Sequence, residues 1–214
     1  MSTTSEYLQE LNHLSRDYRI SVEEASAHTS EFLTAEGLRD RREKMIAQAN
    51  FTHAAKLRQL QARMDTAAYR IQSRAQEALP KAPASTRDSW ERVKMLLDAG
   101  QSLAQVIGKA DAQSLHAIRE WAPTWLDATS KGNTTDLAPF ERSIAERWAE
   151  LVPNAEPIRE YIDSAPDVAT FNQMAESFGN RLEGRESSFG SLSDAFAATY
   201  AGQQAKVNLA SLES

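Results

Sequence analysis

Apolar residues recur at helical spacing along most of the chain. From Ser5 to about Tyr18 the apolar positions follow steps of four, three and four residues, at Tyr7, Leu11, Leu14 and Tyr18. This spacing places them on one face of a helix. Between residues 38 and 79 the chain has neither Gly nor Pro and is rich in residues that favour helix. We therefore predict one long amphipathic helix of about 40 residues there.

A shorter helix is predicted between these two segments. Residues 21 to 24 read Ser-Val-Glu-Glu, a pattern that fits a capping box at a helix N-terminus. The helix would bury Phe32 and Leu33 on its apolar face and end at Gly37, because glycine adopts the left-handed conformation easily after a helix. This helix and the long one form a predicted N-terminal helical hairpin.

The apolar stripe of the long helix is the main indication of a partner. Over its second half, apolar residues recur at alternating steps of three and four, close to the pattern of a coiled coil. The candidate partner-binding residues of this stripe are Leu57, Leu60, Met64 and Ile71. At ~1.5 Å per residue, the helix is longer than a compact domain of this size is wide. We predict that another chain covers the stripe; packing within the chain's own core is the alternative.

The rest of the chain predicts shorter helices. Residues 1–79 form the predicted hairpin or coiled-coil-like region, and residues 80–86 form a Pro-rich linker, because proline lacks an amide donor and restricts the residue before it. Residues 87–183 contain all four Trp and form a predicted helical domain with an aromatic core. No segment alternates β-branched with polar residues, so the predicted fold class is all-α.

Residues 184–214 differ in composition from the rest, with more Gly, Ser and Ala. Apolar residues still recur there near helical spacing, so we predict a flexible or partner-docking helical arm. Its candidate partner-binding residues are Phe189, Leu192 and Phe196.

Charge is distributed unevenly around a net charge of −6. Residues 1–37 hold two Lys/Arg and seven Asp/Glu, whereas residues 38–79 hold nine and four. A basic cluster opens the long helix, where the helix dipole disfavours cations, at Arg39, Arg41, Arg42 and Lys44. We predict that the acidic first segment folds back and neutralises it; an acidic partner surface or nucleic acid is the alternative.

Composition excludes several classes of chemistry. The chain has no Cys, which removes disulfides, thiolate zinc sites, iron–sulfur clusters and thiol nucleophiles. It has no apolar run near the ~20 residues of a membrane helix and no secretory signal pattern. We expect a protein that is cytoplasmic, or is assembled into a particle in the cytoplasm, and that has no membrane partner.

No motif predicts an enzyme. Glu10 and His13 match the Glu-x-x-His step of di-iron bundles, but this site needs a second such pair and the chain has only one. Ser102 follows Gly100 as in a degraded nucleophile elbow, but no strand precedes it, so Ser102 is better explained as a helix N-cap. Phosphate-binding glycine loops are absent. We therefore predict no catalytic, cofactor-binding or metal-ligating residue.

One segment offers an alternative function. Residues 102–121 resemble a helix-turn-helix in their apolar and small positions. The second helix would present Gln113, Ser114 and His116 to base edges. The acidic setting is adverse, because phosphate contacts normally dominate affinity for DNA, so we do not expect a nucleic-acid partner.

These features together predict a non-enzymatic structural or adaptor protein that acts through contacts with a protein partner or through self-association. A long helix, a compact helical domain, a small-residue arm and the absence of Cys resemble the small assembly and virion-associated proteins of bacteriophages. A regulator that binds DNA through residues 102–121 and a helical enzyme without a recognisable motif are the two alternatives.

Overall fold

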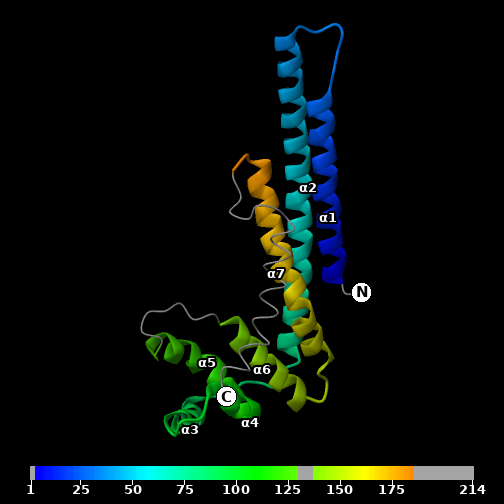
Figure 1. Ribbon diagram of the computed structural model, residues 1–214. Coiled ribbons are helices and arrows are strands. Elements are labelled where there is room, and N and C mark those ends of the chain that lie inside the picture. Colours follow the sequence, from blue (N-terminus) through cyan, green and yellow to red (C-terminus); the bar gives the residue numbers. More distant parts are fainter. Residues whose placement is uncertain (1–2, 130–136, 186–214) are drawn as a thin grey trace. The chain divides into compact units, whose positions relative to one another are not determined.

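The described part of the chain consists of helices joined by loops. A computed structural model describes residues 3–129 and 137–185, which contain seven α-helices and no strand. The helices are α1 (Thr3–Ala27), α2 (Ala35–Glu77), α3 (Arg87–Asp98), α4 (Leu103–Lys109), α5 (Ala112–Thr129), α6 (Ala138–Leu151) and α7 (Glu156–Leu182) (Figure 1). The predicted all-α class and the single long helix are confirmed. None of the helices in these ranges combines the length and apolar character needed to cross a lipid bilayer.

Two compact units divide the chain. The first contains Met1–Ala68 and Ser164–Ser214, and the second contains Tyr69–Asp163. The dividing points therefore fall inside α2 and α7 and not in the Pro-rich segment 80–86, which lies within the second unit. The physical reason is that the last turns of α2 contribute Ala75 to the core of the second unit.

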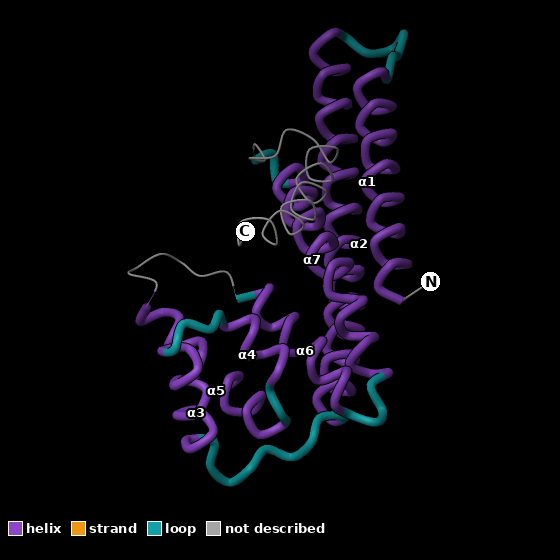
Figure 2. Tube along the Cα trace, turned by 60° about the horizontal axis from the view of Figure 1, so that its bottom comes forward, coloured by secondary structure: helices purple, strands orange, loops and turns teal. Residues whose placement is uncertain are grey.

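The first unit is built from α1, most of α2 and most of α7. Helices α1 and α2 run antiparallel as a hairpin, and α7 lies alongside only part of it (Figures 1 and 2). The core residues are Leu11, Tyr18, Leu57, Leu60, Met64, Phe171, Met174, Ala175, Phe178 and Leu182. Side-chain hydrogen bonds join α1 to both other helices: Thr4 Oγ1 donates to Asp167 Oδ2 of α7 (3.1 Å), and the Tyr18 hydroxyl donates to Asn50 Oδ1 of α2 (3.0 Å).

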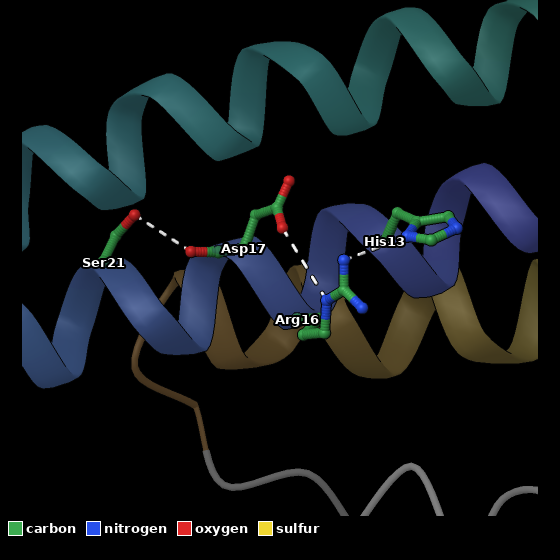
Figure 3. Close-up of polar contacts among 4 residues, drawn as sticks. All are labelled: His13, Arg16, Asp17 and Ser21. Atoms are coloured by element: carbon green, nitrogen blue, oxygen red, sulfur yellow. Dashed lines mark hydrogen bonds and ion pairs between the residues drawn. The ribbon is translucent and has the colours of Figure 1, made fainter.

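Helix α1 continues through Ser21, so the prediction of a new helix there is wrong. The Ser21 hydroxyl donates to the Asp17 carbonyl oxygen at 2.9 Å, inside the helix, and caps nothing (Figure 3). Buried residues of α1 continue on both sides of Ser21, with Tyr18 8% and Ala25 1% exposed. The apolar period across this point therefore outweighs the local capping pattern.

The start of α2 also differs from the prediction, because Gly37 lies in the first turn of this helix and does not end another. Thr34 accepts a hydrogen bond from the Gly37 backbone N–H through its hydroxyl (3.2 Å), and its carbonyl accepts from the Leu38 N–H (2.8 Å). This is the pattern of an N-cap. Phe32 and Leu33 consequently lie in the loop between α1 and α2 and not on a buried helix face.

The second unit packs α3, α4, α5 and α6 around a core that includes Trp90 and Trp148. The Thr86 hydroxyl joins the start of α3 to α5, since it donates to Glu120 Oε2 (2.6 Å) and accepts from Trp121 Nε1 (3.0 Å). Ser102 caps α4 in a complete capping box with Gln105, as its position after Gly100 predicts.

Replacing Gly179 by Ala is expected to stabilise the first unit. Gly179 lies inside α7, where glycine is about 1 kcal/mol less favourable than alanine. A Cβ there would lie 3.8 Å from Leu57 Cδ2, an ordinary van der Waals distance. We expect the free energy of unfolding, measured by chemical denaturation, to rise by about 0.5–1 kcal/mol.

Gly184 provides the matched control, because its φ of +70° is a conformation that alanine rarely adopts. Gly184→Ala is expected to lower stability or leave it unchanged. A loss of stability in Gly179→Ala would show that the space between α7 and α2 is tighter than the structure indicates.

Candidate functional site

The predicted partner stripe of α2 is buried by the chain itself. Leu57, Leu60 and Met64 are 4%, 4% and 0% exposed and belong to the core of the first unit. Ile71 is also buried, at 7% exposure. The intrachain alternative therefore describes all four residues, and they present no open surface to another chain. Phe189, Leu192 and Phe196, the candidates in the C-terminal segment, lie outside the described residues.

The basic cluster lies in the first turns of α2, opposite the end of α1. Arg42 Nε donates to the His28 carbonyl oxygen at 2.9 Å, which ties α2 to the preceding loop. Arg39 pairs with Glu43 on its own helix, at 3.8 Å. Within the described ranges, no ion pair joins the cluster to the acidic residues of the first segment. Folding of that segment back onto the long helix is observed, but the cluster's specific charge partners are local.

The most exposed apolar side chain of the described residues lies at the turn of the hairpin. Phe32 is 96% exposed, and its neighbour Leu33 is 42% exposed. The loop backbone around them is held by local hydrogen bonds, such as that from the Phe32 N–H to Ser30 Oγ at 3.3 Å. We call residues 28–44 the hairpin end. It presents an aromatic ring to solvent on a backbone that is fixed on both sides by α1 and α2 (Figure 1).

Sequence reasoning missed this feature because Phe32 fits the apolar period of the preceding segment. The signal that identifies the loop is Thr34, which stands three residues before Gly37 and caps α2. Placing the N-cap at Thr34 and not at Ser21 would have left Phe32 and Leu33 outside both helices.

The Glu10 and His13 pair forms no metal site in this fold. Glu10 accepts from Arg63 Nη1 at 3.0 Å, and His13 Nδ1 contacts Arg16 Nη2 at 3.3 Å (Figure 3). Among the described residues, no group of three or more His, Cys, Asp or Glu is placed to hold a metal ion. Both side chains are engaged with neighbouring arginines on the surface of the first unit.

The helix-turn-helix candidate consists of α4 and α5, but its predicted reading residues are largely engaged. The Ser114 N–H donates to Asp111 Oδ1 at 2.8 Å. Hydrogen bonds from the backbone and the side chain of Ser114 lower the pKa of the Asp111 carboxyl. His116 Nε2 lies 3.1 Å from the Pro80 carbonyl oxygen, and its ring packs on Trp148 with centroids 4.9 Å apart. Of the three predicted side chains, only Gln113 is exposed.

The position of His116 makes the second unit sensitive to acid. Burial lowers the pKa of this imidazole below its ordinary value of 6.5; the contact with the Pro80 carbonyl opposes the shift, and the nearby Arg119 adds to it. The unfolded chain therefore takes up the proton at a higher pH than the folded chain does. The stability contributed by neutral His116 is present above pH 6.5 and is lost as the pH falls below it.

We expect the free energy of unfolding of the wild type to fall between pH 7 and about pH 5 more steeply than that of His116→Gln, which cannot titrate there. Urea denaturation at the two pH values measures the difference. Equal pH dependence in both proteins would contradict a neutral, partly buried His116.

A pocket of about 230 Å³ lies within the second unit, between α2, α5, α6 and α7. Its apolar floor includes Ala75, Ile144, Trp148 and Ile158, each less than 9% exposed. Charged side chains, Arg119 from α5 and Glu141 from α6, also line it and are exposed. This pocket was not predictable from the sequence, because its walls come from four separate helices.

Comparisons of this chain with protein-family models, with curated proteins and with solved structures find no match. Two features of the fold offer a surface or a space for another molecule: the hairpin end of the first unit and the pocket of the second.

Proposed function

We propose that this chain is a non-enzymatic helical protein that acts by binding another protein chain through its hairpin end, as a structural or adaptor component. The observation that carries the proposal is the 96% exposure of Phe32 at the turn between α1 and α2. Assembly into a particle, as in the bacteriophage proteins that the sequence resembles, is the setting we propose for this contact.

The chemistry of the hairpin end fits an interface. Aromatic residues are enriched among those that dominate binding energy, and they are usually surrounded by polar residues that exclude water. Phe32 has such surroundings, with exposed Glu31 and Glu36 beside it in sequence and exposed Arg39 and Arg41 on the next turns of α2. Charges of both signs favour a protein partner over a phosphate backbone, which would select for cations alone.

The shape of the hairpin supports the same proposal. Helix α7 covers only part of the hairpin, and the turn extends past the end of α7 (Figures 1 and 2). Among the described residues, this extension consists of α1 and α2, and Ala25 of α1 is buried there at 1% exposure. A pair of helices that projects in this way presents its tip to other molecules without any change in the core.

Light scattering over a range of protein concentrations tests the proposal. If the hairpin end binds a second copy, the mass should rise with concentration, and Phe32→Ser should weaken association by about fivefold or more. Tyr69→Ser is the matched control, because Tyr69 is an exposed aromatic residue on α2 but lies roughly 50 Å along the helix from its first turn.

The proposal fails if the wild type remains a monomer at all concentrations and no partner is recovered by pull-down. It also fails if Tyr69→Ser weakens association as much as Phe32→Ser does. Because Phe32 and Tyr69 are both exposed, the two variants should keep the thermal stability of the wild type.

A further inference from the structure

The pocket of the second unit contains a buried hydrogen-bond donor without a partner. Trp148 lines the pocket and is 2% exposed, yet its indole Nε1 has no hydrogen-bond partner among the described residues. A buried donor left unsatisfied destabilises the structure that holds it. By contrast, the indole of Trp121 donates to Thr86 at 3.0 Å. The nitrogen itself is covered by neighbouring atoms, so an acceptor that enters from outside the chain reaches it only when side chains at the pocket move aside.

The size and walls of the pocket limit what can enter. An apolar cavity of about 150 Å³ is large enough for benzene, so a pocket of about 230 Å³ has room for a molecule of one or two rings. The buried Ile144, Trp148 and Ile158 require most of this molecule to be apolar.

The charged side chains of the pocket favour an anionic acceptor on the side of α5. Arg119 forms no ion pair within the described part of the chain, and its guanidinium offers a planar set of donors that matches a carboxylate. Glu141 lines the same pocket from α6 and has the opposite charge. A carboxylate is therefore attracted by one wall and repelled by the other, which gives two mutations with effects of opposite sign.

We propose that this pocket is a binding site for a small aromatic or aliphatic carboxylate, whose apolar body packs on Ile144, Trp148 and Ile158 and whose acceptor oxygens pair with Arg119 and the Trp148 indole. This site is independent of the proposed contact at the hairpin end. All of its residues belong to the second unit.

Titration of the full chain with 2-naphthoate, followed by ¹H–¹⁵N NMR of the four indole N–H groups, tests the proposal. Trp148→Phe assigns the resonance of Trp148. We expect that resonance to shift saturably downfield, while the Trp121 resonance, whose N–H already has an acceptor, moves little. Arg119→Gln should weaken binding about threefold, and Glu141→Gln should strengthen it by a similar factor.

Two controls separate the proposal from nonspecific binding. Arg159→Gln removes an exposed charge of the same unit that does not line the pocket, and it should leave the affinity unchanged. Naphthalene, which lacks the acceptor, should not move the Trp148 indole resonance downfield. The proposal is overturned if that resonance does not shift up to the solubility limit of 2-naphthoate, if all four indoles shift alike, or if Arg119→Gln and Arg159→Gln bind equally.

Discussion

Met64→Ala is expected to lower the free energy of unfolding by about 2–5 kcal/mol. Met64 is 0% exposed and lies in the core that α1, α2 and α7 form together. Truncation to alanine removes buried apolar surface and leaves a cavity between helices that are distant in sequence, so the surroundings can close it only in part. The loss is a large fraction of the stability that a domain usually has.

Urea denaturation followed by circular dichroism measures this loss. Met95→Ala is the matched control, since Met95 is 65% exposed on α3 and its truncation should change stability by less than about 0.5 kcal/mol. If Met64→Ala were as mild as Met95→Ala, Met64 would be exposed in solution. The stripe of α2 would then be open to a partner after all.

Trp148→Ala is expected to have an effect of similar size in the second unit, about 3–5 kcal/mol. Trp148 is 2% exposed, packs against His116 with ring centroids 4.9 Å apart, and belongs to the core shared by α3 to α6. Its removal would deprive both the core and the pocket of a buried indole ring.

Trp121→Ala is the comparison that separates burial from residue type. Trp121 is 40% exposed and would lose chiefly its hydrogen bond to Thr86, so a loss of about 1 kcal/mol is expected. Thermal and urea denaturation of both variants measure the difference. Equal losses would contradict the placement of Trp148 at the centre of the second unit.

The regular features of this fold were predictable from sequence because they are encoded locally. The absence of Gly and Pro between residues 38 and 79 predicts a long helix, and the structure has one at Ala35–Glu77. Capping at Ser102 was predictable for the same reason, since Gly100, with φ of +89°, ends one helix and Ser102 begins the next.

The errors arose where a local signal competed with a longer pattern. Ser21 has the sequence of a capping box, yet the buried positions Tyr18 and Ala25 continue one helix through it. Gly37 was predicted to end a helix because of its residue type. Its contact with Thr34 shows that the same residue fits the first turn of a helix equally well.

The candidate sites depend on tertiary structure and so could not be predicted in full. An apolar stripe on a helix looks the same whether its own chain or a partner covers it, and only the positions of α1 and α7 show that Leu57, Leu60 and Met64 are covered internally. The pocket is less predictable still, because Arg119, Glu141 and Trp148 are brought together by the packing of separate helices.

Site-specific crosslinking shows whether the hairpin end contacts another protein chain. The chain has no Cys, so Phe32→Cys introduces a single thiol that can be labelled with benzophenone maleimide, and Tyr69→Cys provides the control position. We expect that irradiation of the purified protein, or of the protein in the cell that produces it, joins position 32 to a second polypeptide and leaves position 69 unlinked. Equal crosslinking from the two positions, or none from position 32, would contradict it.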